Sequence, residues 1–160
     1  YMQKDLYQEG DGLWNTDYPE AGSYTPLGQP RVYHSQASDI LIITYGNGVL
    51  LSLKAAKKLF DHHQIKVRIM DLRWLQPLNE KAIKQIAREF DKILIVDEGR
   101  RSACVGEGVI TVLATQTDKP QHIQLLTGSD CFTPLADSAG LVLPNVDTVY
   151  RHLRQLQEIH

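Results

Sequence analysis

Residues 91–110 read Asp-Lys-Ile-Leu-Ile-Val-Asp-Glu-Gly-Arg-Arg-Ser-Ala-Cys-Val-Gly-Glu-Gly-Val-Ile, and this stretch decides the fold. Ile93 to Val96 are four consecutive β-forming residues without polar and apolar alternation, which predicts a strand covered on both faces near the centre of a parallel sheet. Asp97 to Arg101 are predicted to form a charged turn at the carboxyl end of this strand, where open α/β sheets usually keep their functional residues. Ser102 is predicted to begin a helix rich in small residues.

Strands and helices alternate on both sides of this stretch. Predicted strands occupy residues 31–34, 40–45, 65–70, 93–96 and 122–126. Predicted helices occupy residues 49–62, a segment that begins after Asn79 as N-cap, 102–115 and 147–157. The helix at 49–62 carries an apolar stripe that includes Leu53, Leu59 and Phe60, and a long loop is expected over residues 127–145. Helical crossovers imply parallel strands, so the fold class is α/β and the architecture is a three-layer α/β/α sandwich.

The chain divides into an arm and one domain. Residues 1–29 combine glycine and proline with scattered aromatic side chains, which is typical of an extended interdomain linker whose rings lie against a surface. Residues 30–160 form the predicted α/β domain. Pro30 directly precedes the strand at 31–34 and favours an edge position for it.

The charge balance excludes several classes of partner. With 17 basic and 19 acidic residues the formal net charge is -2, so nothing favours nucleic acid or an acidic membrane surface. No apolar run reaches the roughly 18 to 20 residues that span a bilayer, and no signal-peptide core is visible, so we expect a cytoplasmic or mitochondrial-matrix protein. Cys104 and Cys131 lack a metal-ligand spacing and are predicted to be buried or half-buried thiols.

Two short motifs resemble ligand sites but have the wrong spacing. Gly46-x-Gly48 follows a strand, yet Leu51 stands where the dinucleotide fingerprint needs its third glycine, so a tight turn that tolerates positive φ is the favoured interpretation. His62 and His63 are helical neighbours that point about 100° apart, so helix-end capping is favoured over metal binding. We therefore predict no catalytic, cofactor-binding or metal-binding residue in this chain.

The best candidates for a role beyond solubility are Glu98, Arg100 and Arg101. Guanidinium and carboxylate groups at the carboxyl end of a strand can form bidentate pairs within one chain or between chains. No serine or cysteine lies in a nucleophile-elbow sequence, and no acid/base pair accompanies a pocket signature. Ion pairing in a scaffold or an interface is therefore favoured over catalysis.

Several motifs occur together in a characteristic order. The most specific is Val-Arg-Ile-Met-Asp-Leu-Arg-Trp-Leu-Gln-Pro-Leu at residues 67–78. The others are Tyr-Thr-Pro-Leu-Gly-Gln-Pro-Arg-Val at 24–32, Leu-Ile-Ile-Thr-Tyr-Gly at 41–46, Ile-Val-Asp-Glu-Gly-Arg-Arg-Ser-Ala-Cys-Val-Gly-Glu at 95–107 and Thr-Gly-Ser-Asp-Cys-Phe-Thr-Pro at 127–134. Over residues 24–156 the chain resembles the C-terminal domain of transketolase-like, thiamine-diphosphate-dependent enzymes. It is most similar to the β-subunit type of 2-oxoacid dehydrogenase first component.

This resemblance implies a fragment of a larger oxidoreductase. It implies a five-stranded mixed sheet in which residues 31–34 form an antiparallel edge strand. In such enzymes thiamine diphosphate and magnesium are bound by the two preceding domains, so we expect this chain alone to bind neither and to be inactive in oxidative decarboxylation. The expected partners are a second copy of the chain, the remaining domains or α-subunit of the parent enzyme, and the acyltransferase component.

The resemblance also suggests where a partner would lie. We expect Glu98, Arg101, Ser102 and Gly106 to form a two-fold contact in which Glu98 and Arg101 pair within or across the interface. Interior glycines cost a helix up to about 1 kcal/mol each relative to alanine, and close approach of a partner would explain them. Two alternatives are a free-standing flavodoxin-like domain that binds a small molecule, and a pure docking module.

Overall fold

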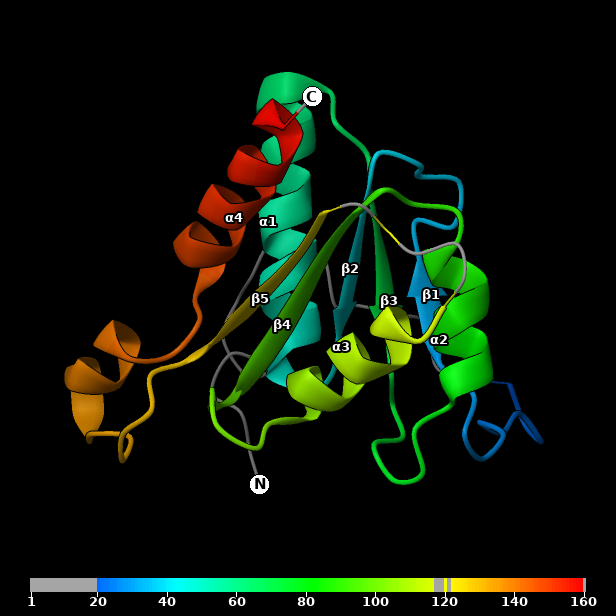
Figure 1. Cartoon of the computed structure of the whole chain (residues 1–160), viewed down its shortest axis with the longest axis horizontal. Helices are drawn as coiled ribbons and strands as arrows, with labels where there is room; N and C mark the ends of the chain where they lie inside the picture. The colour runs from blue at the N-terminus through cyan, green and yellow to red at the C-terminus, as the bar shows by residue number, and fades with distance from the viewer. Residues whose placement is uncertain (1–19, 117–119, 121, 160) are drawn as a thin grey trace.

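The computed structural model describes residues 20–116, 120 and 122–159 (Figure 1). Its strands are β1 (Arg31–Tyr33), β2 (Ile40–Thr44), β3 (Val67–Asp71), β4 (Lys92–Arg100) and β5 (His122–Gly128). Its helices are α1 (Asn47–His63), α2 (Glu80–Ala87), α3 (Val105–Ala114), α4 (Val146–Glu158) and a short 3₁₀ helix, η2 (Ala136–Leu141). Most of the predicted arm, residues 1–19, lies outside the described residues.

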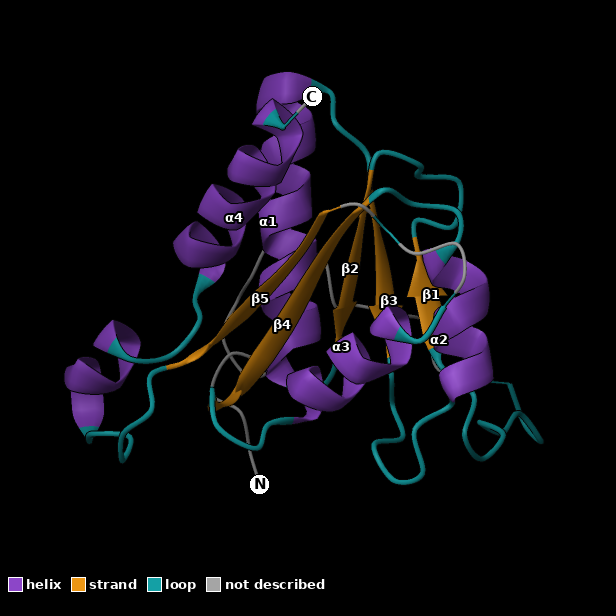
Figure 2. Cartoon of the chain, viewed as in Figure 1, coloured by secondary structure: helices purple, strands orange, loops and turns teal. Residues whose placement is uncertain are grey.

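The strands form one mixed sheet in the order β1-β3-β2-β4-β5 (Figure 2). β2 pairs in parallel with β3 and β4, and β4 pairs in parallel with β5. β1 pairs with β3 in the antiparallel direction, with Arg31 opposite Asp71. The predictions of four parallel strands and one antiparallel edge strand are therefore confirmed.

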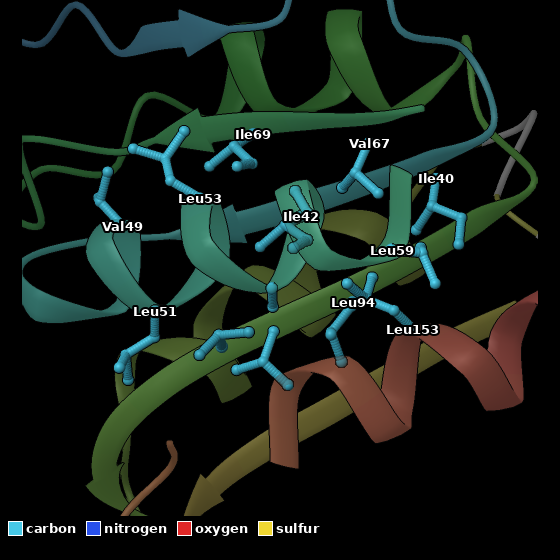
Figure 3. Close-up of a cluster of buried hydrophobic side chains, with 14 of the residues drawn as sticks. Ile40, Ile42, Val49, Leu51, Leu53, Leu59, Val67, Ile69, Leu94 and Leu153 are labelled. Atoms are coloured by element: carbon cyan, nitrogen blue, oxygen red, sulfur yellow. The ribbon is translucent and has the colours of Figure 1, made fainter. Parts of the chain in front are cut away.

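Helices cover both faces of the sheet, as a three-layer α/β/α sandwich requires. On one face α1 and α4 lie side by side, and Leu53, Leu59 and Leu153 pack toward Ile42 and Leu94 of the sheet (Figure 3). On the other face α2 and α3 cover a second cluster around alternate residues of the same strands, including Leu41, Ile43, Ile93 and Ile95. Because both faces are buried, these strands have no polar and apolar alternation.

The stretch that decides the fold departs from its prediction at two boundaries. β4 does not end at Val96 but continues through Asp97 to Arg100, because β5 keeps pairing with it as far as Gly128, with an irregularity between Asp97 and Arg100. The helix begins at Val105 and not at Ser102, because Ala103 has a φ of 62° and left-handed backbone cannot belong to a right-handed helix.

Two predictions of burial are wrong. Phe60 is 41% exposed, because the side of α1 away from α4 borders an open groove of about 770 Å³ next to Ala37 and Val67. Cys131 is exposed on the loop that follows β5, whereas Cys104 is half-buried as predicted.

The predicted N-cap is confirmed, since Ala82 N donates to Asn79 Oδ1 over 3.0 Å. Within the described residues, none of the helices combines the length and apolar character that crossing a bilayer requires.

Candidate functional site

The chain changes direction across the sheet between β2 and β4. From β2 it continues to β3 on one side, and from β4 it continues to β5 on the other, so β2 and β4 border the topological switch point. Open α/β sheets bind their ligands in the crevice at the carboxyl ends of such strands. Tyr45 and Asn47 follow β2 at this point, and Asp97 and Glu98 belong to the last part of β4.

Side chains of the protein itself bridge this crevice. Tyr45 Oη donates to Asp97 Oδ1 over 2.7 Å, and Asn47 Nδ2 donates to Glu98 Oε1 over 2.6 Å. Deeper in the sheet, Thr44 Oγ1 donates to the Val96 carbonyl over 2.8 Å. Tyr45, Asn47, Asp97 and Glu98 are thus bonded to one another in pairs, while Asn47 Oδ1 is buried without a hydrogen-bond partner among the described residues.

Asp97 is the centre of the network and is 1% exposed. Besides Tyr45, it accepts the backbone N–H of Gly99 at Oδ1 over 2.7 Å and that of Gly106 at Oδ2 over 2.8 Å. Gly106 lies in the first turn of α3, where free N–H groups and the helix dipole favour a negative charge. One buried carboxylate therefore ties the end of β4 to the start of α3.

Two glycines are required by close packing at this site. A Cβ on Gly106 would lie 2.6 Å from Leu125 Cδ1 and 3.3 Å from Ile95 Cγ2, so α3 rests directly on the sheet. A Cβ on Gly48, in the first turn of α1, would overlap Thr44 Oγ1. The close approach that the sequence analysis assigned to a partner at Gly106 is made by the chain's own sheet.

The structure brings the other predicted interface residues to one turn but does not pair them with one another. Glu98 is half-buried and bonded to Asn47, while Arg101 and Ser102 are exposed. Ser102 Oγ donates to the carboxylate of Asp130. Among the described residues neither Arg100 nor Arg101 makes an ion pair, so Glu98 and Arg101 are not paired within this chain. A pair across an interface stays a prediction.

A surface groove of about 380 Å³ lies one strand away from the switch point, which we name the β4/β5 groove. It is lined by Glu98, Gly99, Arg100, Gly128, Ser129, Cys131, Phe132, Thr133, Val142 and Leu143. Its wall therefore combines the carboxylate of Glu98 and the guanidinium of Arg100 with apolar side chains from the segment after β5. The sequence predicted a long loop here, and Cys131 in it was expected only as a buried or half-buried thiol.

Sequence reasoning also missed Tyr45 and Asn47, which the structure places beside Asp97 and Glu98. A signal was present, because both follow a buried parallel strand and therefore reach the same end of the sheet as the residues after Val96. Of the two adjacent histidines at the end of α1, His63 contacts α4, with its Nε2 lying 3.1 Å from Tyr150 Oη. The described residues contain no group of three potential metal ligands.

Burial, and then the hydrogen bond to Asp97, raise the pKa of Tyr45 far above its ordinary value of about 10. The folded chain therefore keeps this proton at a pH where the unfolded chain has released it. We expect the free energy of unfolding to fall as the pH rises above about 10. Urea denaturation at a series of pH values should show a shallower alkaline loss in Tyr45→Phe than in the wild type, and identical slopes would contradict this assignment.

Comparison with known proteins gives the chain a family. The family model described as "Transketolase, C-terminal domain" matches residues 31–149, which include the whole sheet and the switch point. The chain belongs to the transketolase C-terminal domain family. As a transketolase C-terminal domain it has the five-stranded mixed sheet that the sequence predicted.

Its relatives are longer proteins. It is 30% identical over 165 residues to the 3-methyl-2-oxobutanoate dehydrogenase subunit beta of Mycobacterium tuberculosis, covering 97% of this chain and 45% of the relative. It is 27% identical over 144 residues to the pyruvate dehydrogenase E1 component subunit beta of Staphylococcus aureus, covering 89% and 44%. This transketolase C-terminal domain thus spans a little under half the length of these relatives.

Solved structures support the same fold. A split-gene transketolase, described as an inactive beta4 tetramer, superposes with a TM-score of 0.70 at 22% identity over 87% of this chain and 45% of that one. A 2-oxoglutarate:ferredoxin oxidoreductase from Magnetococcus marinus superposes with a TM-score of 0.57 at 13% identity over 81% of this chain and 20% of that one. At these identities the likeness concerns the fold alone.

The residues of the switch point do not fit thiamine diphosphate and magnesium. A diphosphate–magnesium group needs oxygen ligands for the metal and donors for the phosphates. Here the carboxylates of Asp97 and Glu98 already accept from Tyr45, Asn47 and backbone N–H groups. We therefore derive no chemical step through this cofactor from the described residues.

Proposed function

We propose that this chain is the C-terminal domain of a thiamine-diphosphate-dependent enzyme of the 2-oxoacid dehydrogenase first-component or transketolase-like type, with a role in assembly and not in chemistry. The observation that carries the proposal is the closed switch point in a member of this family. A domain that took part in catalysis would keep the crevice open at Asp97, whereas here Tyr45 and Asn47 bridge it. Thiamine diphosphate and magnesium would be held by the rest of the enzyme.

The proposed partners follow from the relatives and from the surface. Both relatives named above are β-subunits, so the parent would act with an α-subunit or its fused equivalent in the cytoplasm or mitochondrial matrix. We further propose docking of an acyltransferase component and a two-fold contact through Glu98, Arg101, Ser102 and the helix that contains Gly106. The flavodoxin-like alternative finds no support at the closed switch point.

The two-fold contact is tested by comparing two arginines. Arg101 is exposed on the turn after β4 and makes no ion pair among the described residues, so its guanidinium is available to a carboxylate of a second copy. Arg101→Ala is expected to raise the dimer dissociation constant about tenfold, which corresponds to roughly 1.4 kcal/mol. Arg88→Ala removes an equally exposed arginine at the end of α2 and serves as the matched control.

Sedimentation velocity over a range of protein concentrations measures both dissociation constants. The contact is supported if Arg101→Ala alone weakens association. Equal constants for the two variants would remove Arg101 from the interface, and a wild-type chain that stays monomeric at every concentration would remove the two-fold contact altogether.

A further inference from the structure

One face of the sheet is only partly covered by helices. α1 packs on β2 and β3 and α4 packs on β4 and β5, and neither helix packs closely on β1. Figure 1 shows β3 and β1 continuing beyond α1, on the side away from α4. The open groove of about 770 Å³ that borders Phe60 lies here, at the amino end of β3, and we name it the α1/β3 groove. It lies at the end of the sheet opposite to the switch point.

The floor of the α1/β3 groove is apolar. Leu53 and Ala56 of α1 and Val67 of β3 line it, and the exposed ring of Phe60 stands beside them. Leu53, Ala56 and Phe60 are spaced at i, i+3 and i+7, so they share one face of α1. Small-molecule sites are mostly apolar clefts of about 300–1,000 Å³. The groove therefore has the size and the floor of such a site.

The charged groups that line this groove do not balance. Lys57 Nζ bonds to Asp61 Oδ2 over 2.6 Å, so these two charges compensate each other on the α1 wall. Lys66 lies just before β3, is exposed and makes no ion pair among the described residues. Asp39, which does not line the groove, bonds through Oδ2 to the backbone N–H of Lys66 over 2.8 Å. The Lys66 ammonium is therefore the charge that a ligand would meet.

Neutral polar groups of the loop between β1 and β2 lie at the same groove. His34 Nδ1 lies 3.2 Å from the Val67 carbonyl oxygen, which can only accept, so Nδ1 donates and Nε2 is left for a ligand. The Ser35 hydroxyl and the Gln36 amide line the groove next to it. Polar groups gather on this wall, whereas the floor is apolar, so the groove suits a molecule with one polar and one apolar end.

We propose that the α1/β3 groove binds a small monocarboxylate with an apolar tail. The tail lies over Leu53 and Val67 against the ring of Phe60, and the carboxylate faces Lys66 and the loop at residues 34–36. An acid is favoured over an amine because the carboxylate that lines the groove, that of Asp61, already has a cation as its partner, whereas Lys66 has none among the described residues. The inference does not depend on the proposed function, because the groove is built from the described residues and lies away from the switch point.

Octanoate, at concentrations below micelle formation, is the probe for this site. Its titration into the ¹⁵N-labelled 160-residue chain should give saturable amide shifts confined to residues 34–37, 53–61 and 65–67. Octylamine has the same tail and the opposite charge, and should bind at least about fivefold more weakly. Equal affinities would overturn the assignment of a carboxylate, and an absence of saturable shifts would overturn the site.

The apolar contact is tested by removing one exposed ring at a time. Phe60→Ser should raise the dissociation constant of octanoate about tenfold, because the tail loses the ring that it covers. Phe132→Ser is the matched control, since this ring is 93% exposed on the loop after β5 and lies outside the α1/β3 groove. A loss of affinity in Phe132→Ser, with none in Phe60→Ser, would overturn the inference.

The head group is tested in the same way with two lysines. Lys66→Gln should weaken octanoate binding about threefold and leave octylamine binding unweakened, whereas Lys81→Gln, on the exposed side of α2, should change neither. Shifts confined to the exposed apolar side chains of Phe132, Leu135 and Leu141 would place binding elsewhere and overturn the inference. Groove shifts that grow with protein concentration without octanoate would show that a second copy covers the groove, and would overturn it too.

Discussion

Replacing Asp97 with alanine is expected to lower the free energy of unfolding by about 3–5 kcal/mol. The carboxylate is 1% exposed and accepts hydrogen bonds from Tyr45 Oη and from the backbone N–H groups of Gly99 and Gly106. Tyr45 is half-buried and can turn its hydroxyl to water. The two backbone donors cannot turn, and each unsatisfied buried donor costs about 1–3 kcal/mol.

The variant Asp97→Asn separates the contribution of the two carboxylate oxygens to this loss of unfolding free energy. Asp97→Asn keeps the shape and one acceptor oxygen for Tyr45 and Gly99, but it sets an amide NH₂ against the N–H of Gly106, so we expect an intermediate loss of about 2–3 kcal/mol. Glu98→Gln is the matched control, because Asn47 can still donate to the remaining oxygen and the side chain is only half-buried. Urea denaturation measures all three. If Asp97→Ala were as mild as Glu98→Gln, the carboxylate would not hold β4 to α3.

The strands were predictable because their signal is local. Uninterrupted β-forming runs such as Ile40 to Thr44 and Ile93 to Val96 occur only where both faces of a sheet are buried, and the structure buries both runs completely. The antiparallel direction of β1 had no such signal. A three-residue strand after a proline reveals that it lies at an edge but not which way it runs, and only the resemblance supplied the direction.

The polar network was not predictable because its contacts join distant parts of the chain. Tyr45 and Asp97 are 52 positions apart, and nothing near either residue reveals the other. Asp97 looked like part of a solvated charged turn, since a single sequence does not show that three donors converge on its carboxylate. Because residues 97–101 were interpreted as a charged turn, the predicted β4 ended too early, and the predicted α3 began at Ser102 instead of Val105.

The exposure of several large apolar side chains was also not predicted from the sequence, for a different reason. An apolar stripe on a helix shows which side chains can be buried. Which of them are buried depends on how far the neighbouring elements extend over the helix. Phe60 lies at the margin of α1 that faces away from α4, where its ring is covered only in part and stays 41% exposed. Phe132, Leu135 and Leu141 likewise read as ordinary loop residues in the sequence.

Gly48→Ala is expected to lower the free energy of unfolding by about 2 kcal/mol, although alanine is the better helix former. The new Cβ would overlap Thr44 Oγ1, and Thr44 is 1% exposed with its hydroxyl bonded to the Val96 carbonyl. Turning this β-branched side chain away would break that hydrogen bond and leave a buried acceptor on β4.

A double-mutant cycle isolates this overlap. Thr44→Ala removes the hydroxyl that the new Cβ would overlap. Gly48→Ala should therefore cost about 1–2 kcal/mol less in the Thr44→Ala background than in the wild type. Gly46→Ala is the control: a Cβ there would meet nothing within 4 Å, but its φ of +56° strains any L side chain. Its loss of about 1–2 kcal/mol should therefore be the same in both backgrounds. Additive losses for Gly48 and Thr44 would show that backbone conformation, and not the contact between α1 and β2, requires the glycine at position 48.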